Sequence, residues 1–233
     1  MRLVLLRHGQ TPANVLGQLD TAVPGAGLTG LGHRQAAEAP TGLTSLASLD
    51  GHLPVERLWV STLVRTQLTA APLAAATGLS PTVLDGLREI AAGDLEMLDD
   101  PTSQGRYDST CLAWARGDLG VRNPGGENGH EFFRRYDDAV DTILAAGGST
   151  VVAVSHGAAI RVWVAARCID TGAEFAVEHQ LDNTGAAVLG SVDPGGRGAG
   201  RWKLDEWHAG PVGGRELHDE TAEDPTGEGR ASS

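Results

Sequence analysis

Two histidines in this chain share one local context, directly after an apolar run and directly before a glycine. His8 lies in LVLLRHG and His156 in VVAVSHG. Both runs predict buried strands, and open α/β sheets bind ligands at the carboxyl ends of such strands. Gly9 and Gly157 carry no Cβ, so backbone or ligand can approach closely. The repeated pattern predicts that His8 and His156 face one another across one edge of a sheet.

A lone histidine is more often a hydrogen-bonded core or surface residue than a functional one. We apply that ordinary interpretation to His33, His52, His179, His208 and His218. The shared strand-end context distinguishes His8 and His156 from them.

Charged side chains near these strand ends indicate a site for an anion. Arg7 precedes His8, and Arg65 lies one helical turn after Ser61, where another apolar run ends. The arginine fork matches phosphate oxygens, although Arg65 alone would read as an exposed helical residue. Glu89, in LREIAAGDLE, is either a general acid or a salt-bridge partner. Weaker candidates are His130 and Arg135, for which a solvated or salt-bridged helix face is an equally good explanation, and Arg161, for which an exposed or salt-bridged position is the preferred one.

The chain as a whole is acidic, with a formal net charge of -12 over 233 residues. Nucleic acids and anionic membranes bind basic surfaces, so neither is an expected partner. No apolar run is long enough to cross a bilayer or to act as a signal peptide, which predicts a cytoplasmic protein. The two cysteines, Cys111 and Cys168, fit no disulfide framework and no metal-binding spacing, and we expect both to be buried.

Short apolar runs alternate with segments of helical period. The runs cover 2–6, 57–61, 81–84, 150–155, 186–192 and 201–207. This alternation predicts an α/β fold, a three-layer sandwich with helices on both faces of a mostly parallel sheet. The turn-rich 193–200 predicts a hairpin between the last two runs. Asn128 and Glu131 have capping-box spacing before a helix, and Pro40 predicts a break or kink in another.

These elements predict one domain over residues 1–209. Within it, weak periodicity and many turn formers in 94–126 predict a lid or insertion over the site. From 210 to 233 the chain is polar, acidic and nearly free of large apolar residues, which predicts a disordered tail.

Several motifs together resemble the histidine phosphatase superfamily, in its phosphoglycerate mutase-like branch. The motifs occur in the family's order over about residues 1–190. They are RHG, Asn14 six residues after His8, LTGLGHRQA, SxxxRTxxTA, LREIxxGxxE, PGGE and SHGAAIR. The resemblance implies a phosphoglycerate mutase-like fold. It also implies that His8 is a nucleophile that becomes a transient phosphohistidine, and that Glu89 protonates the leaving alcohol and then activates water. Since Glu89 must first be protonated, we expect activity at acidic to neutral pH.

The same resemblance places Arg7, Arg65 and His156 around the phosphate oxygens. The remaining substrate-binding candidates are Asn14, Gly9 and Gly157. Together the positive groups would replace a metal ion, so we expect no metal and no cofactor.

Departures from the mutase pattern favour hydrolysis. SHGAAIR stands where mutases have SHGN, and PANVLGQLDTAVPGAGLTG replaces their recognition segment after RHG. The leading interpretation is a phosphatase, of the histidine acid phosphatase type, that acts on a small phosphorylated metabolite such as a sugar phosphate or a phosphoglycerate derivative. The alternatives are phosphoglycerate mutase-type transfer and a catalytically silent phosphate- or partner-binding module. A homodimer remains open.

Overall fold

The computed structural model describes residues 1–49, 55–192 and 202–227. The strands are β1 Arg2–Arg7, β2 Val55–Val60, β3 Thr82–Val83, β4 Thr150–Ser155, β5 Ala186–Ser191 and β6 Trp202–His208. The α-helices are α1 Pro12–Val15, α2 Gly30–Thr44, α3 Val64–Thr77, α4 Pro101–Ala115, α5 Gly129–Ala146, α6 Gly157–Arg167 and α7 Phe175–Glu178. Short 3-10 turns cover Ala47–Leu49, Asp85–Leu87, Gly93–Leu95 and Arg215–Leu217.

The described strands form one mixed sheet in the order β3-β2-β4-β1-β5-β6. The β1, β4, β2 and β3 strands are parallel, whereas β5 and β6 run antiparallel at one side. Arg7 pairs in register with Ser155, the last residue of the neighbouring strand β4. Consequently His8 and His156, which follow these residues, leave the sheet side by side at its carboxyl edge.

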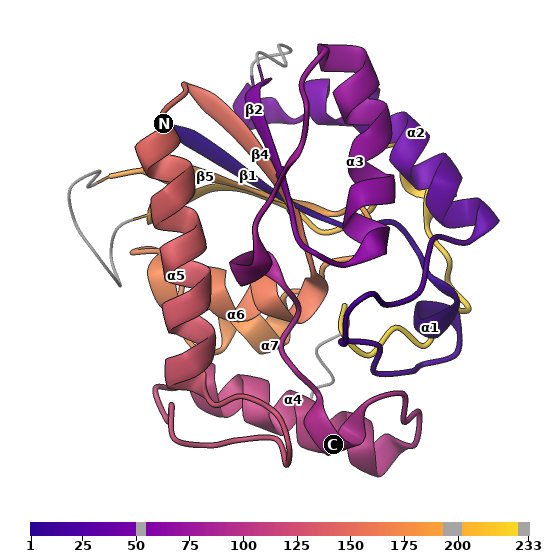
Figure 1. Cartoon of the computed structure of the whole chain (residues 1–233), viewed down its shortest axis with the longest axis vertical. Coiled ribbons are helices and arrows are strands. Elements are labelled where there is room, and N and C mark those ends of the chain that lie inside the picture. The colour runs from indigo at the N-terminus through magenta and orange to yellow at the C-terminus, as the bar shows by residue number, and fades with distance from the viewer. Residues whose placement is uncertain (50–54, 193–201, 228–233) are drawn as a thin grey trace.

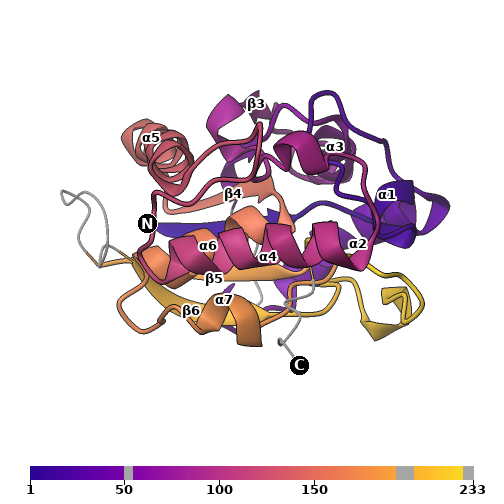
Figure 2. The same cartoon turned by 90° about the horizontal axis from the view of Figure 1, so that it is seen from below.

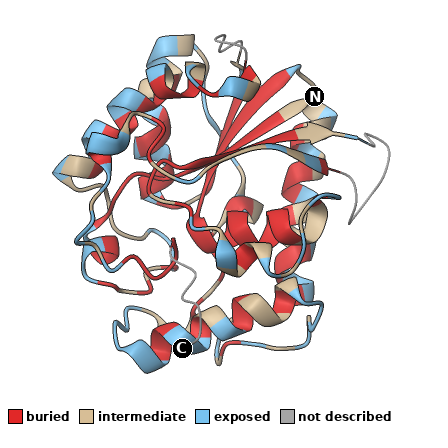
Figure 3. Ribbon diagram, turned by 180° about the vertical axis from the view of Figure 1, so that it is seen from behind, coloured by how far each residue is buried: buried red, intermediate tan, exposed pale blue. Residues whose placement is uncertain are grey.

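Alternation along the strands divides the core into two layers. Leu3 and Leu5 of β1 belong to a buried cluster with side chains of α5 and α6, while Val4 and Leu6 join a second cluster with α2 and α3. Figure 1 shows these helix pairs on opposite sides of the sheet, and the buried strands appear in Figure 3. Each fully buried leucine contributes roughly 1.5–3 kcal/mol. The predicted α/β three-layer architecture is confirmed.

Of the predictions about single elements, two are confirmed and one is wrong. The Asn128 capping box is present, with Glu131 reaching back to the backbone of Asn128. The antiparallel pairing of β5 and β6 is present too, although 193–200 itself lies outside the described residues. The expected break at Pro40 is wrong, since α2 runs through it. A proline within a helix costs about 3 kcal/mol, and burial of Ala39 and Leu43 on its two sides offsets that cost.

The segment 94–126, expected as a lid or insertion, contains α4, which Asp100 caps. Its Tyr107 and Trp114 are buried in the cluster that also holds α5 and α6. Figure 2 shows α4 beside α6. Cys111, also on α4, is free and buried, as is Cys168. Among the described residues, no helix has the length and apolar character needed to span a bilayer.

The predicted disorder of the tail is wrong for residues 210–227, which return to the body of the protein. Val212 and Leu217 are buried, and so are Asp224 and Thr226. The prediction of disorder rested on composition, because a segment with few apolar residues was expected to make few fixed contacts. The segment is instead held largely by polar groups, among them an ion pair between Asp224 and Arg7. Residues 228–233 lie outside the described part of the chain.

Candidate functional site

His8 is held in one tautomer at the end of β1. The carbonyl of Gly9, which can only accept, lies 2.8 Å from Nδ1, so Nδ1 carries the proton. On the other side of the ring, Nε2 accepts a hydrogen bond of 3.1 Å from Arg65 Nε. Burial, then the charges of Arg65 and Arg7, keep the pKa of His8 well below its ordinary value. The ring is therefore neutral, with an unprotonated Nε2.

His156 lies beside His8, with 5.2 Å between the ring centroids, as predicted. Its Nε2 is 2.7 Å from Ser61 Oγ. That oxygen also accepts from Leu63 N–H, and we assign its own proton to the bond with Nε2. This leaves the ring proton on Nδ1, a buried atom with no partner among the described residues. Burial, together with Arg65, lowers the pKa of His156 well below its ordinary value, so this ring is also neutral.

Arg7 and Arg65 are both buried, whereas Arg65 on an ordinary surface helix would be exposed. Arg65 enters from the first turn of α3, is 3% exposed, and donates to the carbonyl of Asp20 at 2.8 Å as well as to His8. Arg7 is completely buried and forms a two-pronged ion pair with Asp224 at 2.5 Å for each oxygen. Desolvated cations of this kind interact strongly with any anion that reaches them.

Glu89 lies at the N-terminus of α6, the helix that begins after His156. Its carboxylate accepts hydrogen bonds from the backbone N–H groups of Ile90, Ala158 and Ala159 at 2.9, 3.2 and 2.8 Å. Burial raises the pKa of this carboxyl, although those N–H groups and the nearby arginines favour its ionised form. Arg135 fixes the loop by donating to the carbonyls of Gly86, Arg88 and Glu89.

Asn14 caps α1 together with Thr11 and points its amide nitrogen toward Asp224, 3.0 Å away. The two strand-end glycines meet protein backbone. A Cβ on Gly9 would lie 2.7 Å from the carbonyl oxygen of Gly32, and one on Gly157 would lie 2.5 Å from that of Thr226. Close packing within the protein thus explains both glycines, in addition to the predicted approach of a ligand.

A small pocket opens at this edge of the sheet. Its lining residues are His8, Thr11, Ala13, Asn14, Gln18, Asp20, Arg65 and Thr226. His8, Arg65 and Asn14 thus share this pocket. His156 lies against the His8 ring, Arg7 and Asn14 meet at Asp224, and Glu89 lies at the adjoining end of α6. Within the described part of the chain, no three His, Cys, Asp or Glu side chains are grouped to hold a metal ion.

Sequence reasoning missed Ser61, Asp20 and Asp224. Ser61 was visible as the first residue of SxxxRTxxTA, yet nothing in the pattern showed that its hydroxyl would meet His156. Asp224 had no signal, because its contact with Arg7 spans more than 200 residues of chain and its surroundings looked like a solvated tail.

A mostly parallel sheet with paired histidines and buried arginines at its carboxyl edge is the architecture of phosphoglycerate mutase-like phosphatases. The profile of the histidine phosphatase superfamily (branch 1) matches residues 3–208. The chain belongs to this superfamily.

Individual relatives fall within the same group. The chain is 37% identical over 223 residues to a PE-PGRS family protein of Mycobacterium tuberculosis, covering 89% of this chain but only 36% of that protein. It is 33% identical to the glucosyl-3-phosphoglycerate phosphatase of M. tuberculosis, covering 94% of that enzyme. The solved structure of the mycobacterial glucosyl-3-phosphoglycerate phosphatase superposes with a TM-score of 0.71 at 28% identity, over 89% of this chain and 98% of the other. That phosphatase has also been solved with vanadate and with inorganic phosphate.

Proposed function

We propose that the protein is a phosphomonoesterase that hydrolyses a small phosphorylated metabolite through a phosphohistidine at His8. The observation that supports this most directly is the state of the His8 ring, with Nδ1 bound to the Gly9 carbonyl and an unprotonated Nε2 beside the Arg65 guanidinium. A neutral imidazole fixed in this way is a nucleophile that needs no general base.

In the first half-reaction, His8 Nε2 attacks phosphorus, the N–P bond forms, and the bond to the ester oxygen breaks. Arg65, Arg7 and the unpartnered Nδ1–H of His156 stabilise the negative charge on the equatorial oxygens, and Asn14 is a neutral hydrogen-bond donor to them. Burial of these groups supports the assignment, because electrostatic stabilisation is larger where water is excluded.

Glu89 is assigned the proton transfers. Protonated, it gives its proton to the leaving alkoxide, and as a carboxylate it then takes a proton from the water that breaks the N–P bond. The raised pKa of Glu89, caused by burial, supports a protonated form nearer to neutral pH. The reaction needs no metal in this scheme, because the arginines supply the positive charge.

For the substrate we infer a sugar phosphate or a phosphoglycerate derivative. The glucosyl-3-phosphoglycerate phosphatase relative, which this chain matches over 94% of its length, supports this class. The chain also shares 32% identity over 165 residues with a probable phosphoglycerate mutase of Yersinia enterocolitica, so mutase activity is the second candidate. Incubation with 3-phosphoglycerate separates the two, since isomerisation faster than phosphate release would establish a mutase.

The test of the proposal is a His8→Ala variant assayed for phosphate release from a panel that includes p-nitrophenyl phosphate and glucosyl-3-phosphoglycerate. We expect turnover to fall at least about a thousandfold, because the covalent route is lost. The matched control is His33→Ala, which removes an exposed histidine of α2 and should leave the rate unchanged. Wild-type enzyme quenched in alkaline denaturant during turnover should carry a phosphohistidine that is stable to alkali and lost in acid, and retained turnover in His8→Ala would overturn the mechanism.

A further inference from the structure

The C-terminal segment, residues 219–227, brings a carboxylate to the arginine that the proposed mechanism needs for phosphate. Both oxygens of Asp224 lie 2.5 Å from terminal nitrogens of Arg7. Asn14, the proposed neutral donor, also gives its amide proton to Asp224, at 3.0 Å. Two of the four side chains assigned to phosphate oxygens, Arg7 and Asn14, are thus both occupied by one acidic side chain of the same molecule.

Arg7 has little donor capacity left in this arrangement. Its two terminal nitrogens donate to the carbonyl of Leu181, to both oxygens of Asp224 and to the hydroxyl of Thr226. Only Nε–H has no partner among the described residues. A two-pronged arginine contact is the geometry that guanidinium makes with carboxylate and phosphate alike. Asp224 therefore occupies Arg7 as two phosphate oxygens would.

Backbone contacts hold the C-terminal segment in place beyond Asp224. The carbonyl of Gly227 accepts from Arg161 at 3.1 Å and from the N–H of Leu181 at 3.1 Å. The Asp224 N–H donates to the carbonyl of Asn14. A side chain at position 227 would collide with Arg7, so the glycine permits the close approach.

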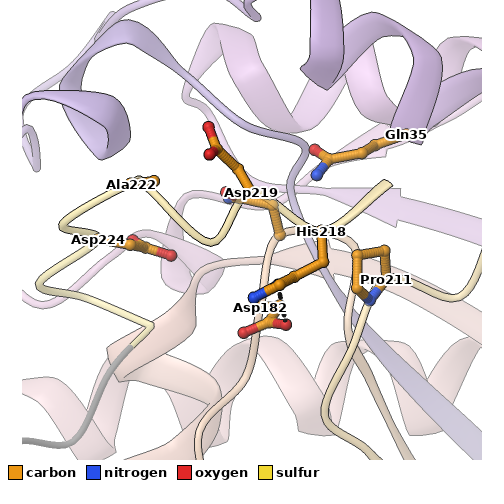
Figure 4. Close-up of a pocket in the computed structure, with 8 residues that line it drawn as sticks. Gln35, Asp182, Pro211, His218, Asp219, Ala222 and Asp224 are labelled. Carbon is orange, nitrogen blue, oxygen red and sulfur yellow. Dashed lines mark ion pairs between the residues drawn. The ribbon is translucent and has the colours of Figure 1, made fainter. Parts of the chain in front are cut away.

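The segment is also tied down before it reaches the site. Asp219 accepts a hydrogen bond of 2.7 Å from Gln10, two residues after His8. Next to it, His218 Nδ1 lies 2.7 Å from a carboxylate oxygen of Asp182. Figure 4 shows Asp219, His218 and Asp182 around a small pocket that Asp224 also lines. Figure 1 shows the same yellow segment passing beside α1.

We propose that the C-terminal segment is an autoinhibitory pseudo-ligand, in which Asp224 occupies the phosphate-binding arginine and must leave before a phosphomonoester can bind. This inference rests on the proposed function only in taking Arg7 and Asn14 as the phosphate-holding groups. A phosphate dianion carries more charge than the Asp224 carboxylate, so a phosphomonoester substrate can compete with the segment for Arg7. The fraction of molecules with the segment docked then sets the apparent affinity for substrate.

The magnitude follows from population arithmetic. A ligand that binds only the fraction of molecules with the segment undocked has its apparent dissociation constant raised by the inverse of that fraction. If one molecule in ten is undocked, removing the Asp224 charge lowers the apparent Kd about tenfold. Since saturating substrate displaces the segment anyway, KM should fall while kcat is unchanged.

The experiment compares full-length wild type with Asp224→Asn and with Glu220→Gln, which removes one exposed charge from the same segment. Orthovanadate binding is measured by calorimetry, and KM and kcat are measured with p-nitrophenyl phosphate. We expect Asp224→Asn to bind orthovanadate and substrate about tenfold more tightly, and Glu220→Gln to match wild type. Equal affinity in all three proteins, or weaker affinity in Asp224→Asn, would overturn the pseudo-ligand and make Asp224 a residue that only positions Arg7.

The unmodified protein offers a second test that does not depend on how a variant folds. Hydrogen exchange of the amides of Asp224 and Leu181 is followed with and without orthovanadate. We expect exchange to speed up when orthovanadate binds, because the segment leaves; slower or unchanged exchange would refute displacement. The proposed function fails separately, if Asp224→Asn binds orthovanadate more tightly but neither protein turns over a phosphomonoester. Absence of orthovanadate binding to both proteins would overturn both proposals.

Discussion

Replacing Ser61 with alanine tests whether a buried hydroxyl sets the donor that His156 presents to the phosphoryl group. The hydroxyl lies 2.7 Å from His156 Nε2, and its donation there leaves the ring proton on the unpartnered Nδ1. In Ser61→Ala, Nε2 loses its donor and either nitrogen can carry the proton. In the proposed mechanism, His156 would then offer a proton to the phosphoryl oxygens in only part of the molecules.

Two effects of different size are expected. Leaving Nε2 buried and unpaired should lower the free energy of unfolding by about 1–3 kcal/mol. Loss of a whole donor aimed at developing charge costs about 10²–10³ in kcat. Because Ser61→Ala weakens the donor without removing it, we expect kcat to fall about 10- to 100-fold, with a smaller change in KM.

The matched control is Ser155→Ala. Ser155 is equally buried, at the end of β4, and its hydroxyl donates to the Leu87 carbonyl and not to a histidine. Both variants should lose similar stability in urea denaturation, but only Ser61→Ala should lose kcat on p-nitrophenyl phosphate. Long-range ¹H–¹⁵N spectra of the histidine rings should show the His156 tautomer changing in Ser61→Ala. The reasoning is refuted if kcat is unchanged, or if both variants lose it equally.

Three further outcomes are expected. Glu89→Gln should cut kcat/KM for an alkyl phosphate about 100-fold or more and remove its decline as pH rises through the Glu89 pKa, whereas an unaltered pH–rate profile would refute the acid role. Burial lowers the pKa of His8 and of His156, so below about pH 6.5 the unfolded chain binds protons that the folded chain does not. Urea titrations should show the free energy of unfolding decreasing as the pH is lowered through this range, by up to about 1.4 kcal/mol per pH unit for each histidine. The His156→Gln variant should show a weaker dependence of this free energy on pH. Gly157→Ala should cost about 1–3 kcal/mol, since its Cβ would lie 2.5 Å from a backbone oxygen, while Gly105→Ala, in open space on α4, should stabilise by about 0.5–1 kcal/mol.

Much of the fold was readable along the chain because the signals are local. An apolar run in β1 that ends at Arg7, and another in β4 that ends at Ser155, predict strands. Parallel strands in a sheet end at the same edge, so the sequence predicted that His8 and His156 share an edge, and the pairing of β1 with β4 makes them neighbours. The capping box at Asn128 is local too, and it was found for the same reason.

Where prediction failed, a local rule was outweighed by contacts from elsewhere. Pro40 removes a hydrogen bond within its own helix, but the helix is held by apolar side chains packed on the sheet. The disorder predicted from residue 210 onward rested on composition, which measures apolar content and takes no account of a specific ion pair. The carboxylate of Asp224 and the apolar side chains of Val212 and Leu217 are among the groups that fix residues that look solvated.

The sequence by itself thus determined the strands, the residue types at their ends and the family they indicate, because alternation, periodicity and short motifs are written in neighbouring residues. Only the tertiary structure decided what those residues meet. The proton positions on His8 and His156 depend on Gly9 and Ser61, and the state of Arg7 depends on Asp224. Hydrogen bonds and ion pairs act over about 3 Å in space regardless of separation along the chain, so the partners that set the site's chemistry appear only once the chain has folded.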